Sequence, residues 1–248
     1  MKNTDFIIQK MRSKKGQIAV LIDPEDTHEP AKIDQLVEKS EFAGVDYFFV
    51  GGSTVSAETF KKTCAYLKSK TATPVVIFPG DHQQLANEPD AILYLSLLSG
   101  RNPEYLIGQH VKSAQDVYQL NMELIPTAYI LINGEKTSSV AYVSQTTPIP
   151  PDQQKIAVNT ALAGVFQGKK AVYFDAGSGA SKSVEPSLIE KLNKMVDVVS
   201  IVGGGIRTIE EIQQLAQANT NVIVIGNKIE EDVDFLLDIK NYHSAQKL

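Results

Sequence analysis

The sequence predicts an α/β fold, a (β/α)8 TIM barrel, as a single domain over residues 1–248. Two observations predict it: eight short apolar runs recur along the chain, and amphipathic stretches lie between most of them. Runs that are apolar throughout, rather than alternating, are typical of parallel strands buried on both faces. Eight such strands alternating with helices in 248 residues form the pattern of this barrel. No linker or shift in composition divides the chain.

The strands and helices follow one another in the order that the barrel requires. The strands are predicted at 17–23, 47–52, 74–80, 91–100, 128–134, 171–177, 198–205 and 221–227. Helical patterns are predicted at 29–44, 58–69, 103–120, 152–168, 208–219 and 231–242. Barrel enzymes carry their active sites at the carboxyl ends of the strands, in the loops that lead to the helices. The candidate functional residues are therefore sought at those strand ends.

Two connections depart from a regular barrel. Residues 81–90, between the third and fourth strands, are polar and short and are interrupted by Pro89. We expect this short loop to replace the third outer helix and to leave part of the barrel wall accessible. Residues 135–154 form a long, proline-containing connection after the fifth strand. Connections of that length in a compact domain are more often functional than idle.

Composition excludes several classes of protein. The net charge of −5 gives no basic field, so nucleic acid is not an expected partner. No window approaches about 18 consecutive apolar residues, and the first residues lack a signal-peptide core, so we expect a cytoplasmic protein without a transmembrane helix. The lone Cys64 excludes an internal disulfide and is expected to be a buried helix residue. The four histidines lack the spacing of a zinc site, and His110 is expected to be a packed or exposed helix residue rather than a substrate contact.

Glycine clusters follow the last two predicted strands. Gly203, Gly204 and Gly205 come after strand seven, and Gly226 and Asn227 come after strand eight. Glycine lets a phosphate approach the main chain, and the N–H groups at a helix start favour an anion. These two positions are the usual phosphate site of the barrel, so the sequence predicts phosphate binding there. The alternative, that each glycine only makes a tight turn, explains one cluster more easily than two.

A third glycine-rich loop follows strand six, in the stretch “AVYFDAGSGA” (171–180). We expect a small phosphorylated molecule to rest its phosphate on the three loops while Tyr173 and Asp175 address its hydroxyls. The alternative is that Asp175 is a turn residue bonded to its own loop.

Carboxylates also follow strand one, in “LIDPED” (21–26). Asp23 stands at the strand end, and Ser53 in “GGST” (51–54) follows the adjacent strand two. Mg²⁺ prefers oxygen ligands, commonly one or two carboxylates together with substrate phosphates. Asp23 is therefore the better ligand candidate, whereas Glu25 and Asp26 are expected to be surface charges.

Six motifs carry a family resemblance along nearly the whole chain: “LIDPE”, “GGST”, “YLSLLSGRNPEYLIGQH”, “YFDAGSGA”, “VGGGIRT” and “VIGN”. Together they resemble the geranylgeranylglyceryl phosphate synthases, a family related to heptaprenylglyceryl phosphate synthase. These prenyltransferases make the first ether bond of archaeal membrane lipids and have relatives in some bacteria. The long fourth-strand motif and the “AGSGA” loop are specific, whereas the glycine clusters alone match many phosphate-binding barrels.

The resemblance implies sn-glycerol 1-phosphate as acceptor, geranylgeranyl diphosphate as donor, and Mg²⁺ held by Asp23 and Ser53. It implies that glycerol phosphate is held by Tyr173, Phe174, Asp175, Ala176, Gly177, Ser178, Gly179, Gly203, Gly204, Gly205, Gly226 and Asn227. The family usually carries glutamate where this chain has Asp175. The shorter side chain leaves open whether the carboxylate contacts the glycerol hydroxyl directly or through a water. Family members also replace the third outer helix by a loop.

The chemistry of this reaction assigns roles to two side chains. The 3-hydroxyl of the acceptor attacks the prenyl C1 as diphosphate leaves, and its proton needs a base. We expect Asp175 to be that base and Tyr173 to orient the acceptor. The apolar prenyl tail needs a groove near the thinned wall, for which Tyr94, Leu97, Leu98 and Tyr105 are candidates. Ordinary core packing is the alternative for each of these four.

Other functions also fit a phosphate-binding barrel. A flavin-dependent oxidoreductase uses the same phosphate loops, and a non-catalytic phosphometabolite-binding protein needs neither Asp23 nor Asp175. A phosphosugar isomerase or aldolase is a third alternative, but no predicted strand ends in the lysine that the aldolase requires. Apolar residues on the helix at 103–120 are candidates for a subunit contact in a homo-oligomer. A lipid product would also bring the protein into peripheral contact with a membrane.

Overall fold

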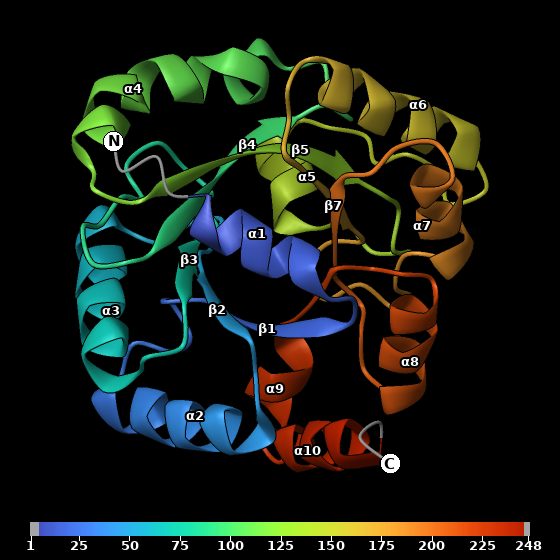
Figure 1. The fold of residues 1–248 in the computed structure, drawn as a ribbon. Helices are drawn as coiled ribbons and strands as arrows, with labels where there is room; N and C mark the ends of the chain where they lie inside the picture. Colours follow the sequence, from blue (N-terminus) through green and yellow to red (C-terminus); the bar gives the residue numbers. More distant parts are fainter. Residues whose placement is uncertain (1–4, 246–248) are drawn as a thin grey trace.

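The computed structural model describes residues 5–245 and has eight parallel strands closed into a barrel, which confirms the predicted fold (Figure 1). The strands are β1 (Gln17–Ile22), β2 (Tyr47–Val50), β3 (Val75–Ile77), β4 (Ala91–Leu97), β5 (Glu123–Leu131), β6 (Ala171–Asp175), β7 (Val199–Gly203) and β8 (Val222–Ile225). Each strand pairs with the next one along the chain, and β8 pairs with β1 to close the ring. All carboxyl ends therefore lie at one rim, where the predicted site residues are gathered.

Seven helices cover the outside of the barrel (Figure 1). They are α2 (Pro30–Ala43), α3 (Ala57–Lys70), α4 (Gln109–Gln119), α6 (Gln154–Phe166), α7 (Pro186–Asn193), α8 (Ile209–Gln217) and α10 (Phe235–Ala245). Local signals set several of their starts: Ser56 accepts a hydrogen bond from the N–H of Thr59 in α3, and Thr208 forms a capping box with Glu211 in α8. Cys64 is buried in α3, as predicted.

The connection between β3 and β4 contains no helix, as predicted from its length and polarity. The chain reaches α4 after β4 through one π-helical turn, η1 (Glu104–Gly108), in which the N–H of Gln109 bonds the carbonyl of Glu104. Such turns widen a helix by one residue and are frequent at functional sites. Here the widened turn carries Tyr105 beside the part of the wall that lacks an outer helix.

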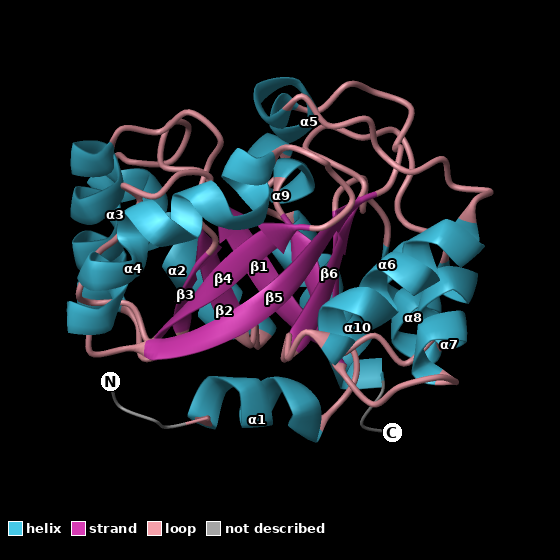
Figure 2. Ribbon diagram, turned by 90° about the horizontal axis from the view of Figure 1, so that it is seen from above, coloured by secondary structure: helices cyan, strands magenta, loops and turns pink. Residues whose placement is uncertain are grey.

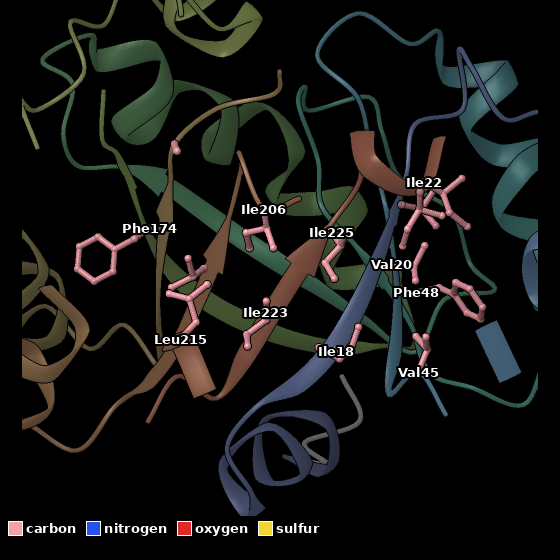
Figure 3. Packing of buried hydrophobic residues seen from close by; sticks show 14 of the residues in the cluster. Ile18, Val20, Ile22, Val45, Phe48, Phe174, Ile206, Leu215, Ile223 and Ile225 are labelled. Carbon is pink, nitrogen blue, oxygen red and sulfur yellow. The ribbon is translucent and has the colours of Figure 1, made fainter. Parts of the chain in front are cut away.

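Alternate strand residues build two separate apolar cores, because successive side chains of a strand point to opposite faces. One set, including Ile18, Val20 and Phe48, packs between the strands and the helices (Figure 3). The other set, including Phe49 and Tyr173, fills the interior of the barrel. Burying a large apolar side chain of this kind stabilises the fold by about 1.5–3 kcal/mol.

Helix α1 (Phe6–Ser13), which the sequence analysis did not predict, lies across the amino-terminal end of the barrel (Figure 2). Ile7, Ile8 and Met11 pack into the interior core. The buried carboxylate of Glu123 accepts hydrogen bonds from the N–H groups of Ile7 and Ile8 at 2.6 and 2.9 Å. A negative charge at a helix start is favourable, so this contact fixes α1 to the bottom of β5.

Strand β5 differs from its prediction, because it begins at Glu123 rather than at residue 128 and ends at Leu131. Pro126 lies in this added segment, where β5 pairs with β4 while its ladder with β6 begins only at Thr127. A proline is tolerated there because one side of the strand needs no ladder donor. The long connection after β5 holds a short helix, α5 (Ser139–Ser144), and a further short helix, α9 (Asn227–Glu231), follows β8.

Candidate functional site

A pocket opens at the carboxyl ends of the strands and is lined by the loops that follow β1, β2, β3, β6, β7 and β8. It brings together most of the predicted binding residues from segments that are far apart in the sequence. Of the predicted set it contains Asp23, Ser53, Tyr173, Asp175, Ser178, Gly204, Gly205, Gly226 and Asn227. The predicted metal candidates and the predicted phosphate loops therefore share one cavity.

Asp175 is the last residue of β6, and its carboxylate is almost completely buried at the pocket wall. Its Oδ1 accepts a hydrogen bond from the N–H of Gly177 at 2.7 Å, and its Oδ2 accepts one from the hydroxyl of Tyr129. Burial raises the pKa of Asp175 above its ordinary value, and the two hydrogen bonds oppose that rise. The bond to Gly177 is the one expected if Asp175 were only a turn residue, but Asp175 also lines the cavity.

Three aromatic rings form the floor of the pocket beside this carboxylate. Tyr173 stacks on Phe78 with ring centroids 5.0 Å apart, and Tyr129 meets both rings edge-on. The sequence analysis missed Tyr129 because it lies in the middle of an apolar run. The alternation of side chains along β5 could have identified it, because Tyr129 is in register with the inward-facing Tyr173. Burial raises the pKa of both tyrosines, so they are neutral hydroxyl groups at physiological pH.

The loop after β7 requires glycine at two successive positions. Gly204 and Gly205 have φ of +83° and +71°, values that side chains other than glycine rarely adopt. A Cβ atom on Gly204 would lie 2.7 Å from Oδ1 of Asp175 and 2.6 Å from the nitrogen of Gly177. The loop after β7 therefore packs its bare backbone directly against the carboxylate of Asp175.

Five of the residues predicted to hold glycerol phosphate do not line the pocket, and three of them, Phe174, Ala176 and Gly203, pack elsewhere. Phe174 is directed to the helix side of β6 and lies in the outer core together with Ala176 (Figure 3). Strand alternation forces this, because Tyr173 and Asp175 face inward. Gly203 is the third: a Cβ atom there would lie 2.2 Å from the hydroxyl of Tyr173, so this glycine makes room for the tyrosine. The predicted contacts of the Phe174 and Ala176 side chains and of Gly203 with the acceptor are therefore corrected.

The loop after β6 is tied to the loop after β8 by one side chain. Asn227 accepts hydrogen bonds at Oδ1 from the N–H of Gly179 at 2.9 Å and from the hydroxyl of Ser178 at 3.2 Å. Gly177 and Gly179 do not line the cavity themselves, and their N–H groups are bonded to Asp175 and Asn227. Asn227 is also the first residue of α9, and N–H groups in the first turn of a helix have no partner within the helix.

Across the pocket, Asp23 follows β1 directly, and its carboxylate lies against bare backbone. A Cβ atom on Gly52 would lie 2.4 Å from Oδ1 of Asp23 and 2.5 Å from Oδ2, and Ser53 follows in the same loop. Burial raises the pKa of Asp23, and the neighbouring carboxylates of Asp26 and Glu25 raise it further, against a hydrogen bond from the N–H of Glu25. Glu25 bonds Thr54 at the surface, and Asp26 is exposed as well, both as expected, although Asp26 also lines the pocket.

Glu230, on α9, is a pocket residue that the sequence analysis missed. Burial of its carboxyl group, together with Asp26 and Asp23, raises its pKa to about 7. The residue as a whole is exposed, although it lines the pocket, and its position in a charged helical stretch, “NKIEEDVD”, gave no signal that separated it from its neighbours. Arg207 and Lys228 also line the cavity, but they are paired with Glu231 and Asp232.

The three carboxylates on this side of the pocket, Asp23, Asp26 and Glu230, do not form a complete metal cage. Among residues 5–245 no group of three histidine, cysteine, aspartate or glutamate side chains has the arrangement to hold a metal ion. Asp23 and Ser53 nevertheless offer carboxylate and hydroxyl oxygens at one edge of an acidic cavity. This donor set is the kind that Mg²⁺ takes when phosphates and waters complete its coordination.

A second cavity adjoins the first along the wall that lacks an outer helix. Pro79, Gly80, Leu95, Tyr129 and Val140 line both cavities, so the two spaces meet around these residues. The second cavity is otherwise mainly apolar. Of the four predicted groove residues, it contains Tyr94, Leu97 and Tyr105.

Leu98, the fourth predicted groove residue, lies elsewhere. It packs against the outer core, and its Cδ1 would lie 2.8 Å from a Cβ atom on Gly164 of α6, so the groove prediction is corrected at this position. His110 is buried and lines the second cavity with its ring edge-on to Tyr94, at 4.4 Å between centroids. Burial lowers the pKa of His110, and Lys169 lowers it further. His110 is thus a packed helix residue, as expected, but one whose ring faces the groove.

Comparisons with known proteins agree with this arrangement. The PcrB family model matches residues 9–242. A geranylgeranylglyceryl phosphate synthase from Chitinophaga pinensis is 44% identical over 241 residues, covering 97% of this chain and 95% of the relative. A protein of the same name from Pyrococcus abyssi is 38% identical over 226 residues, covering 91% of this chain and 88% of the relative.

A solved structure is similar over almost the whole fold. The crystal structure of (S)-3-O-geranylgeranylglyceryl phosphate synthase from Thermoplasma acidophilum, in complex with sn-glycerol-1-phosphate, has a TM-score of 0.87 and 34% identity. The match covers 97% of this chain and 96% of that one. In the part of the chain that the structure describes, no helix is long and apolar enough to cross a membrane.

Proposed function

Because the chain belongs to the PcrB family, we propose that it is a prenyltransferase that joins sn-glycerol 1-phosphate to geranylgeranyl diphosphate. The product is an ether between the 3-hydroxyl of the acceptor and C1 of the prenyl chain, and diphosphate is released. The observation that carries this proposal is the position of Asp175, a buried carboxylate that opens into a pocket between three glycine-rich loops. The flavin-binding and non-catalytic alternatives gain no support from the relatives named above.

The acceptor's phosphate rests on the loops after β6, β7 and β8. Ser178, Gly204, Gly205 and Gly226 line the pocket there, and glycine lets a phosphate approach the main chain closely. A glycerol phosphate bound in this way extends its hydroxyls toward Tyr173 and Asp175. The phosphate thereby fixes the distance between the loops and the reacting oxygen.

The carboxylate of Asp175 takes the proton of the attacking hydroxyl. The oxygen of that hydroxyl forms a bond to the prenyl C1, while the bond from C1 to the diphosphate oxygen breaks. The raised pKa of Asp175 makes it a better proton acceptor than an exposed aspartate, and a positioned base typically contributes about 10²–10⁴-fold in rate. Tyr173, packed between Phe78 and Gly203, orients the acceptor beside this carboxylate.

Mg²⁺ fits the opposite side of the pocket. Asp23 and Ser53 would hold it, and the like charge of Asp26 beside Asp23 favours a cation at this edge. When bound, the metal supplies neutralisation of the diphosphate charge that grows as the C1–O bond breaks. The chain's own contribution is to keep these oxygens on the far side of the cavity from Asp175.

The prenyl tail occupies the second, apolar cavity. The donor carbon lies where the cavities meet, around Leu95, Tyr129 and Val140, and the tail continues past Tyr94 and Tyr105. Apolar lining of this kind gains about 25 cal/mol for each Å² of tail surface removed from water.

Incubation with labelled sn-glycerol 1-phosphate and prenyl diphosphates of several lengths, with and without Mg²⁺, tests the function. We expect Mg²⁺-dependent release of diphosphate and transfer of the label into a lipid-soluble product, with the twenty-carbon donor among the best substrates. Absence of product with every donor would contradict the proposal. A visible absorption band in the purified protein would instead favour the flavin alternative.

The protein's contacts with other molecules follow from its exposed apolar side chains. Ile107, Val111 and Tyr118 are exposed on one stretch of η1 and α4, and we propose that this face contacts a second copy of the chain. Tyr142 and Val143 of α5 are exposed beside the cavity that Val140 lines, and we propose that they touch the membrane when the lipid product leaves. Light scattering and vesicle flotation test the two contacts separately.

A further inference from the structure

The side chain of Asn227 joins two loops of the acceptor site, and its orientation is fixed by chemistry. The N–H of Gly179 can only donate, so the atom that receives it at 2.9 Å must be the amide oxygen. The amide nitrogen of Asn227 therefore points the other way, where it donates to Oε2 of Glu230 at 3.3 Å. A chain of hydrogen bonds thus runs from the loop after β6, through Asn227, to Glu230.

Glu230 differs from its acidic neighbours on the same helix. Glu231 pairs with Arg207 and Asp232 pairs with Lys228, whereas Glu230 has no lysine or arginine within ion-pair distance among the described residues. Its carboxyl group instead faces the pocket, near the carboxylates of Asp23 and Asp26. Placing a third acidic group there is unfavourable unless the group makes a contact that the site needs.

We propose that Glu230 is a positioning residue: through Asn227, it holds the Ser178–Gly179 loop in the arrangement that receives the phosphate of the acceptor. Ser178 and Gly179 gain a fixed hydrogen-bond acceptor only while the amide of Asn227 keeps its orientation. Without Glu230 the amide of Asn227 is held only at its oxygen, so its bonds to Ser178 and Gly179 are less firmly fixed. The proposal deepens the proposed function and rests on it, since it concerns the binding of the same acceptor.

Two substitutions separate the hydrogen bond from the charge. Glu230→Gln keeps a carbonyl oxygen that accepts from Asn227 and removes the charge, whereas Glu230→Ala removes both. We expect Glu230→Ala to raise the KM for sn-glycerol 1-phosphate about tenfold, the effect of one lost hydrogen bond and a loosened loop. We expect Glu230→Gln to stay within about threefold of the original protein, and the KM for the prenyl diphosphate to change little in either variant.

Asp234→Ala is the matched control, because Asp234 lies just after α9, pairs with Lys39 at the surface and does not line the pocket. Calorimetric binding of sn-glycerol 1-phosphate without donor gives a readout that is independent of turnover, and circular dichroism checks that each variant is folded. The affinity for the acceptor should fall with Glu230→Ala only.

The outcomes distinguish this inference from the proposed function. If the original protein makes no prenyl ether and binds no sn-glycerol 1-phosphate, both the proposed function and the positioning role of Glu230 are contradicted. An active protein in which Glu230→Ala binds the acceptor normally overturns the positioning role alone. The role is equally overturned if Glu230→Gln falls as far as Glu230→Ala, or if the loss appears in the KM for the prenyl diphosphate instead.

Discussion

Tyr129 donates its hydroxyl hydrogen to Oδ2 of Asp175, although 46 positions separate the two residues in the chain. The contact exists because β5 and β6 are neighbours whose register places Tyr129 opposite Tyr173, two residues before Asp175. Side chains two positions apart on a strand share a face, so both groups enter the barrel. The tyrosine thus holds one oxygen of the proposed base, and the N–H of Gly177 holds the other.

Asp175→Asn should lower kcat by about 10²–10⁴-fold, because the amide keeps the shape of the carboxylate but accepts no proton. The affinity for sn-glycerol 1-phosphate should change by only a few fold, since the phosphate contacts come from other residues. Steady-state kinetics and calorimetry measure the two quantities. Near-normal turnover of the folded variant would exclude Asp175 as the base.

Tyr129→Phe should move the acidic limb of the pH–rate profile to higher pH. The base must be ionised to work, so activity falls as the pH drops through the pKa of Asp175. The hydrogen bond from Tyr129 favours the ionised form and lowers that pKa, against the larger effect of burial. Removing the hydroxyl therefore raises it further. An acidic limb that stays in place would show that Tyr129 does not tune this group.

Gly204→Ala should be much more damaging than Gly168→Ala. Both glycines have positive φ, +83° and +88°, so each substitution costs about 1–2 kcal/mol of stability from backbone strain. Only the Cβ atom at residue 204 would collide with Asp175 and Gly177, whereas nothing lies within 4 Å at residue 168. Urea unfolding should register a loss in both variants, while kcat/KM should fall sharply in Gly204→Ala alone. Equal activity in the two variants would contradict the packing argument.

When no metal or substrate is present, Glu230→Gln should increase the free energy of unfolding over that of the original protein, and by more at pH 8 than at pH 5. The pKa of Glu230 is raised to about 7 in the folded state from 4.5, so the fold favours the protonated form. That contribution is complete below pH 4.5 and is lost as the pH rises through about 7. For a partly screened carboxyl group we expect a difference of roughly 1–2 kcal/mol between the two pH values.

Urea denaturation of the original protein and the variant at both pH values measures this difference. Using the variant as the reference cancels the titration of the groups that do not interact with Glu230. A stability difference that is the same at pH 5 and pH 8 would mean that Glu230 titrates normally in the folded protein.

The barrel and most of the glycine loops could be predicted from the sequence, because buried parallel strands are apolar throughout and strand ends carry the chemistry. Asp23 and Asp175 were found because each stands directly at such an end. Tyr129 was missed because a tyrosine inside an apolar strand looks like core until the register with β6 is known.

Two other differences have the same origin in three-dimensional packing. Phe174 was grouped with its loop although strand alternation sends it to the helix side. Glu230 was overlooked because only the return of α9 over the rim brings it near Asp23 and Asp26. The sequence pattern identifies which loops matter, whereas pairing and helix placement decide which side chains in them enter the cavity.

The α1 helix covers the base of the barrel, whose interior is filled by side chains. Ile7, Ile8 and Met11 fill that base, and the carboxylate of Glu123 secures the helix there. Reactants and products must therefore pass through the rim pocket and the second cavity that adjoins it. We expect diphosphate, which is small and ionic, to leave through the polar rim, and the apolar prenyl chain to leave along the second cavity. The release of one product then does not depend on the release of the other.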